Sequence, residues 1–127
     1  MKKTKYLYWL PAVLFASLIF YMSEQQNPPG ASLFEFLPNA DKLAHMAEYF
    51  ILSLFVYLAL VKVHAFRTPA AAFFSIMIVS IYGASDEFHQ NFTPGRTVDF
   101  FDWLADLTGA LAAQSGIIMH KIIDDLL

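Results

Sequence analysis

The chain has 127 residues, of which 57% are hydrophobic and only 15% are charged, and its formal net charge is −3. This composition is far from that of an average soluble domain, and the few dispersed cations exclude a nucleic-acid-binding surface. Because the sequence contains no cysteine, disulfides and thiol chemistry are excluded as well. We therefore expect a single integral membrane domain that covers residues 1–127.

Four apolar segments each approach the roughly 20 residues that a helix needs to cross a hydrocarbon core. They cover residues 6–22, 44–63, 69–88 and 98–119. The first segment is longer than the apolar region of a secretory signal, and no small-residue cleavage site follows it, so we expect an uncleaved anchor. The sequence thus predicts an all-α fold, an integral membrane four-helix bundle.

The distribution of Lys and Arg predicts the orientation of this bundle, because these residues favour the cytoplasmic side. One side would hold Lys2, Lys3, Lys5, Lys62, Arg67 and Lys121, and the other only Lys42 and Arg96. We expect a multi-pass protein of the cytoplasmic membrane with both termini cytoplasmic and residues 23–43 and 89–97 outside. Within the first outer connection, residues 32–38 are predicted to lie at the membrane interface.

The connection before the fourth segment carries its own local signals. Pro94 and Gly95 suit a type II turn. Thr97 is predicted to cap the following helix, with Asp99 in its first turn, where the helix dipole favours a negative charge.

Small residues recur along the fourth segment at intervals of four. One row consists of Ala105, Gly109 and Ala113, and a neighbouring row contains Ala112 and Gly116. Such rows let helix backbones approach closely in a membrane, so we expect the fourth helix to be central in the bundle.

Polar residues gather at the predicted outer ends of the second, third and fourth helices, in stripes with helical spacing. The second helix carries Asp41, His45 and Glu48, and Tyr49 and Ser53 extend this stripe. The third ends in Asp86, Glu87, His89 and Gln90, of which residues 86, 89 and 90 are predicted to share a face. The fourth carries Asp99, Asp102 and Asp106, and Arg96 lies in the loop before it.

Acids greatly outnumber fixed cations in these stripes. The acids are Asp41, Glu48, Asp86, Glu87, Asp99, Asp102 and Asp106, and the cations are Lys42 and Arg96. A charge near the bilayer centre costs about 2.5 to 3.5 kcal/mol, so we expect the stripes to face one acidic cleft open to the outer side. Lys42 is predicted to pair with Asp99, and Arg96 with Asp86 or Glu87. The surplus acids need protons, histidines or an external cation.

Two stretches, DKLAHMAEYF at 41–50 and DEFHQNFTPGRTVDFFDWLADLTGA at 86–110, together with the preceding SEQQNPPG, resemble the VanZ-like family of small membrane proteins. The resemblance covers residues 20–116. This chain departs from the family's pattern at Asp106, where that family more often has Asn. It implies a multi-pass membrane protein related to one linked to resistance against the glycopeptide teicoplanin, and it supplies no reaction.

Candidate site residues follow from the stripes and from the resemblance. Candidates for binding a ligand or an ion are Asp41, Lys42, His45, Glu48, Tyr49, Asp86, Glu87, Gln90, Arg96, Asp99, Asp102 and Asp106. Candidates for acid/base catalysis are His45, Asp86, Glu87 and Asp102. A divalent cation is a possible cofactor, with His45, Asp86, Glu87, Asp102 and Asp106 as its candidate ligands.

Three functions fit these residues, beside a purely structural role for the charges. The first is a binding or protective factor in the lipid bilayer, whose outward polar site engages a lipid, a lipid-linked precursor or a lipophilic glycopeptide. The second is an integral membrane enzyme, metal-assisted or not, that acts on a lipid or lipid-linked substrate. The third is a proton or cation pathway, which the uncharged first segment disfavours.

Overall fold

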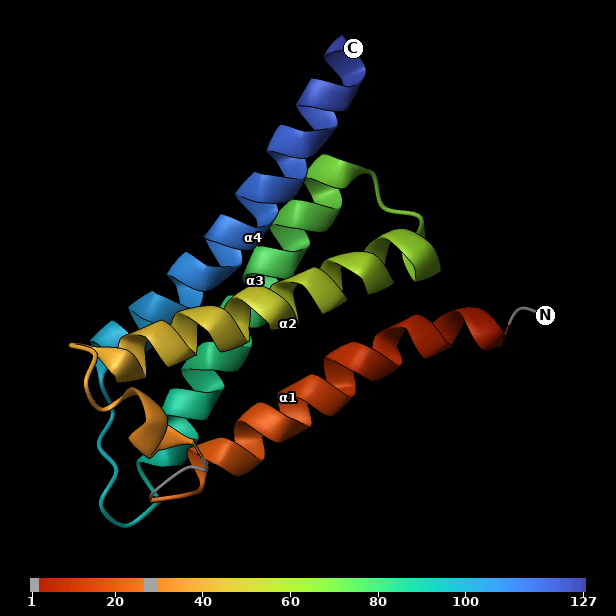
Figure 1. Ribbon diagram of the computed structural model, residues 1–127. Helices are drawn as coiled ribbons and strands as arrows, with labels where there is room; N and C mark the ends of the chain where they lie inside the picture. Colours follow the sequence, from red (N-terminus) through yellow and green to blue (C-terminus); the bar gives the residue numbers. More distant parts are fainter. Residues whose placement is uncertain (1–2, 27–29) are drawn as a thin grey trace.

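The computed structural model describes residues 3–26 and 30–127, and this part of the chain is helical without any strand (Figure 1). Two short 3₁₀ segments, η1 (Thr4–Trp9) and η2 (Ala31–Phe34), accompany four α-helices. The α-helices are α1 (Leu10–Ser23), α2 (Ala40–His64), α3 (Thr68–Gln90) and α4 (Phe100–Leu126). The prediction of an all-α chain with four helices is confirmed.

Three stretches are long and apolar enough to cross a membrane: Thr4–Ser23, Ala40–His64 and Thr68–Gln90. Large apolar side chains cover their outer surfaces, such as Phe73 (58% exposed) and Ile81 (64% exposed). Such a surface suits contact with lipid rather than with water. The fourth helix, with 27 residues, is also long enough to cross a membrane. However, it is not as apolar and as poor in charged residues as the other three stretches.

The first span begins as a 3₁₀ helix because of Pro11. Proline has no N–H, so it cannot donate the hydrogen bond to residue 7 that a continuous α-helix would need. Instead the N–H of Leu10 donates to the carbonyl oxygen of Leu7, which ends η1. The two helical pieces, η1 and α1, together form one span of 20 residues.

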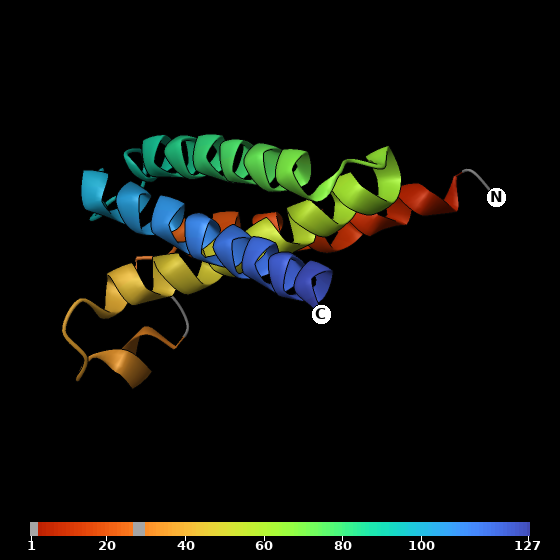
Figure 2. The same ribbon diagram turned by 90° about the horizontal axis from the view of Figure 1, so that it is seen from above.

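The second helix, α2, organises the bundle, since it packs against α1, α3 and α4. Figure 1 shows α1 along one side of α2 and α4 on the other, while α3 crosses behind α2 and ends near the end of α1. The core joins Ile19 of α1, Leu52 and Val56 of α2, Val79 of α3 and Ala110 of α4. Figure 2 shows the start of α2 and the α3–α4 connection at the same end of the bundle. The prediction that the fourth helix is central is therefore wrong, because α2 has this place.

Close approach of α4 to α2 does occur at the first predicted row of small residues. A Cβ on Gly109 would overlap the backbone carbonyl oxygen of Met46. Ala105 and Ala113, of the same row, are buried as well. In contrast, a Cβ on Gly116 would meet nothing within 4 Å, so the second row does not pack.

The bounds of two helices, the second and the fourth, differ most from those predicted. The second begins at Ala40, four residues before the predicted apolar segment, and Asp41 lies in its first turn. The fourth continues past residue 119 to Leu126, and an ion pair at i, i+4 joins Lys121 Nζ to Asp125 at 2.8 Å in these last turns.

The loop before α4 confirms one local prediction and corrects another. The N–H of Arg96 donates to the carbonyl oxygen of Thr93 at 3.1 Å, and Gly95 has a φ of 81°, as in the predicted type II turn. However, the N-cap of α4 is Asp99, whose side chain accepts from the N–H of Phe101 at 2.8 Å. The prediction of Thr97 as the cap was therefore wrong by two residues, since the helix starts at Phe100.

Candidate functional site

Lys42 joins three carboxylates where α2 and α4 begin. Its Nζ donates to Asp41 and Asp99, each at 2.8 Å, and to Asp102 at 2.6 Å. The predicted pair of Lys42 with Asp99 is confirmed. The Lys42 ammonium holds the pKa of the Asp99 carboxyl below its usual range. Because one lysine serves three acids, it leaves no positive charge for the carboxylates deeper between the helices.

Arg96 lies away from the deeper acids. Its guanidinium donates to the carbonyl oxygens of Gln25, at 3.1 Å, and Met22, at 3.5 Å. The predicted pairing with Asp86 or Glu87 is wrong, because the end of α1 offers carbonyl oxygens that attract a cationic side chain. Arg96 thus fixes the α3–α4 loop to the end of α1.

The last two turns of α3 bury Asp86, Glu87 and Gln90, which are 2%, 4% and 1% exposed. His89 instead lies outside this group and stacks on Phe20, with ring centroids 4.2 Å apart. The predicted face of residues 86, 89 and 90 is therefore partly wrong. Glu87 takes the place of His89 because α3 turns this side toward α4, where the Glu87 carboxylate accepts from the N–H of Asp99 at 3.2 Å.

Asp86 is held by a residue that sequence reasoning missed. The hydroxyl of Ser23, at the end of α1, donates to Asp86 Oδ2 at 2.6 Å. The Tyr49 hydroxyl lies 3.5 Å from the same oxygen, and Gln90 Nε2 lies 3.4 Å from Ser23 Oγ. Nothing in the spacing of α1 marked Ser23, because that segment has no polar stripe.

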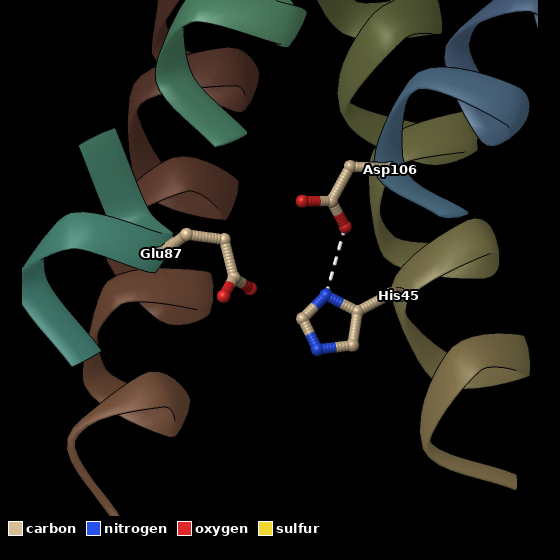
Figure 3. Close-up of side chains that lie close together, drawn as sticks. All are labelled: His45, Glu87 and Asp106. Atoms are coloured by element: carbon tan, nitrogen blue, oxygen red, sulfur yellow. Dashed lines mark hydrogen bonds and ion pairs between the residues drawn. The ribbon is translucent and has the colours of Figure 1, made fainter. Parts of the chain in front are cut away.

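His45 and Asp106 form a buried pair between α2 and α4. His45 Nδ1 lies 2.8 Å from Asp106 Oδ1, and His45 Nε2 lies 3.8 Å from Asp102 Oδ2. Asp106 is 1% exposed and His45 9% exposed. Figure 3 shows the carboxylate of Glu87 pointing toward this pair from α3. The deepest predicted acid thus has a histidine partner on another helix.

Three buried carboxylate oxygens find no hydrogen-bond partner among the described residues. They are Asp86 Oδ1, Glu87 Oε1 and Asp106 Oδ2. A buried charged oxygen is costly unless it is paired, so each needs a proton or a cation. Asp106 Oδ2 also lies close to α3, where a Cβ on Gly83 would come within 2.9 Å of it. The glycine therefore leaves room for the carboxylate between the two helices.

A pocket of about 500 Å³ opens beside this acidic cluster. Its wall combines apolar residues, such as Met22, Phe34 and Ala44, with polar ones, such as His45 and Glu48. Gln90, Arg96 and the largely exposed Asp41 also line it. Because His45 belongs both to the pocket wall and to the pair with Asp106, the pocket and the buried cluster form one continuous site.

A second buried polar pair lies deeper in the bundle. Gln114 Nε2 donates to Ser53 Oγ at 2.7 Å and to the Ser53 carbonyl oxygen at 3.1 Å. Sequence reasoning placed Ser53 on the polar stripe of the second helix but missed Gln114. The spacing did contain a signal, since Gln114 lies eight residues after Asp106 and so continues its helix face.

The fold and the site define a small helical membrane protein with a buried acidic cluster at one end of its bundle. A model of the VanZ/LLP1 family matches residues 4–122, so the chain belongs to this family. The resemblance to VanZ-like proteins is thereby confirmed.

An uncharacterized protein of Schizosaccharomyces pombe, C11E3.10, is 33% identical over 87 residues, which are 67% of this chain and 51% of that protein. The matched region thus spans about half the length of this relative. No solved structure matches the chain.

Proposed function

We propose that the protein binds the polar head of an amphipathic cell-envelope molecule in its pocket, while the apolar part of that molecule stays in the bilayer. The observation that supports this most is the pocket of about 500 Å³, with its mixed lining, at one end of a bundle whose outer surface is apolar. Sites for small ligands commonly have volumes of this order.

The polar wall of the pocket favours a head group that donates hydrogen bonds. Glu48 and Asp41 offer carboxylate oxygens, and Gln90 offers a side-chain amide. Hydroxyl and ammonium groups, as in sugar- or amine-bearing heads, suit such acceptors. Met22 and Phe34 provide an apolar wall for the first carbons of a lipid chain.

The segment around η2 suits a position at the level of lipid head groups. Leu33, Phe34 and Phe36 are 69%, 54% and 79% exposed. Exposed aromatic and aliphatic side chains on a short helix favour the boundary between water and acyl chains. Because Phe34 also lines the pocket, a lipid head at this boundary would have direct access to the site.

The bound molecule would be a membrane lipid, a lipid-linked precursor or a lipophilic glycopeptide. Family membership supports a role in the cell envelope, and resistance to teicoplanin would follow if the protein changed access to a lipid-linked target. In this proposal α4 crosses the cytoplasmic membrane together with the other three helices. Both termini lie in the cytoplasm, and the pocket opens to the outer side.

Cysteine labelling tests this orientation, because the natural chain has no cysteine. Thr97→Cys, in the α3–α4 loop, should react with an impermeant maleimide on intact cells. Arg67→Cys, between α2 and α3, should react only after permeabilisation. Both positions are exposed, and the reverse pattern would refute the orientation.

Filling the pocket tests the binding function. Ala44→Trp places a large ring at the pocket wall, and Ala70→Trp places the same ring on an exposed position of α3 as a matched control. We expect Ala44→Trp to lose the lipids that co-purify with the protein, measured by mass spectrometry, and any effect on teicoplanin susceptibility. Equal lipid content and equal susceptibility in both variants would contradict the proposal.

An enzymatic function is the second candidate, and the His45–Asp106 pair favours it. A buried carboxylate that binds Nδ1 fixes the orientation of the ring and leaves Nε2 as the atom for proton transfer. The substrate would be a lipid or lipid-linked molecule in the same pocket. Release of a head group from the host's lipid extract by the wild type, but not by His45→Gln, would favour catalysis. Binding without turnover would favour the first function.

A further inference from the structure

The buried part of the site joins three side chains of types that bind metal ions. His45 comes from α2, Glu87 from α3 and Asp106 from α4, and all three point into one space (Figure 3). One donor atom from each residue can be chosen so that all lie within 4.8 Å of one another. Two donors at about 2.1 Å from one ion lie no more than about 4.2 Å apart. Small side-chain movements would therefore bring these donors to coordination distance.

Unpartnered oxygens give an independent reason to expect a ligand here. Glu87 Oε1 and Asp106 Oδ2 are buried and have no hydrogen-bond partner among the described residues. Their side chains belong to residues that are 4% and 1% exposed. Since buried carboxylates are costly unless they are paired, hydrogen-bonded or bound to a metal, these oxygens favour a cation between them.

The fixed cations of the site are engaged elsewhere. Lys42 is held by Asp41, Asp99 and Asp102 at the start of α2 and α4. Arg96 is held by carbonyl oxygens at the end of α1. Within the described residues, neither Lys nor Arg forms an ion pair with Glu87 or Asp106. A cation for these two carboxylates would have to come from outside the chain.

We propose that His45, Glu87 and Asp106 bind one divalent transition-metal ion of the Zn²⁺ or Mn²⁺ class. One imidazole and two carboxylates suit such ions, whereas Mg²⁺ and Ca²⁺ prefer oxygen donors alone. Three protein ligands leave coordination positions open for water or for a ligand.

Since His45 also lines the pocket, the ion would be within reach of a phosphate or hydroxyl group of a bound lipid head. This last step rests on the proposed function, whereas the metal site itself does not.

Metal stoichiometry tests the site directly. Full-length protein in detergent is stripped with EDTA, equilibrated with ZnCl₂ or MnCl₂, desalted and measured by mass spectrometry of its metal content. We expect one ion per chain in the wild type and most of it lost in Glu87→Gln and Asp106→Asn. Asp86→Asn is the matched control, because Asp86 is an equally buried acid bound to Ser23 instead, and it should keep the ion.

Wild-type protein alone keeps the test decisive if a variant does not fold. Cobalt(II) added to stripped wild type should give visible absorption bands typical of nitrogen and oxygen ligands. Absence of stoichiometric zinc, manganese and cobalt binding would overturn the inference, as would metal loss in Asp86→Asn but not in Glu87→Gln. Lipid measured in the same samples separates the two proposals. Lipid retained without any metal refutes this inference alone, and metal bound without any lipid refutes only the proposed function.

Discussion

The two ends of α4 carry acids at similar density but in opposite surroundings. Near its start, Asp102 and Asp106 are 8% and 1% exposed and meet side chains of α2. In its last turns, Asp124 and Asp125 have side chains that are 62% and 64% exposed, and their partners lie on α4 itself. The comparison teaches that a charge indicates a site when its partner comes from another helix and water is excluded from both.

Removal of one acid from each end should give the largest difference in stability. Asp106→Ala would leave His45 Nδ1 buried without its acceptor, and breaking a buried pair in this way costs about 3 kcal/mol or more. Asp124→Ala removes an exposed partner of His120 and should change the free energy of unfolding by less than about 0.5 kcal/mol. Unfolding of both variants in detergent, followed by circular dichroism, measures the difference. Similar losses would mean that the two ends do not differ as described.

Two glycines of α4 test the same difference between its two ends, by packing instead of by charge. Gly109→Ala would push a Cβ into the backbone carbonyl of Met46, and overpacking of this kind costs about 1 to 3 kcal/mol. Gly116→Ala meets open space and replaces glycine by the best helix former, so it should be neutral or stabilise by up to about 1 kcal/mol. Thermal unfolding in one detergent compares them. An equally stable Gly109→Ala would refute the close approach of α2 and α4.

Replacement of a lysine at each side of the bundle should give a smaller difference in the free energy of unfolding. Lys42→Met leaves Asp99 and Asp102 without their shared donor. Loss of a charged hydrogen bond from the nearly buried Asp102 should lower the free energy of unfolding by about 1.5 kcal/mol. Lys62→Met, at an exposed position near the end of α2, should stay within about 0.5 kcal/mol of the wild type. Chemical unfolding measures both, and equal values would contradict the role of Lys42.

Helical spacing predicted much of this site because the residues of one stripe keep their relation whatever the helix packs against. The stripe from His45 through Tyr49 to Ser53 is buried as predicted, and so is the row from Ala105 to Ala113. The excess of acids over fixed cations also correctly predicted that some carboxylates would have no Lys or Arg partner in the described part of the chain.

Spacing did not predict which neighbour each side chain would meet. Both Glu87 and His89 lie at the end of α3, and only the direction in which α3 faces α4 decides that Glu87 is buried. Arg96 lies in a loop, whose path depends on the packing of the whole bundle. In the structure its guanidinium donates to a carbonyl oxygen at the end of α1. Ser23 was missed for the same reason, because its importance comes entirely from Asp86.

Capping of α4 gives the smallest expected effect and tests the corrected helix start. Asp99 accepts from the N–H of Phe101 and from Lys42, so Asp99→Ala should lower the melting temperature, whereas Asp99→Asn should keep the cap and lose only the charge. Thr97→Ala, at the exposed position first predicted as the cap, should change nothing.

The acidity of Asp99 adds a dependence on pH. Because the pKa of Asp99 is lowered in the folded protein, its charge stabilises the fold above the ordinary aspartate pKa of about 3.9, and this contribution is lost as the pH falls further. The difference in melting temperature between wild type and Asp99→Asn should therefore be present at neutral pH and shrink toward zero below about pH 4. A difference that grows on acidification would show that Lys42 does not stabilise the ionised form.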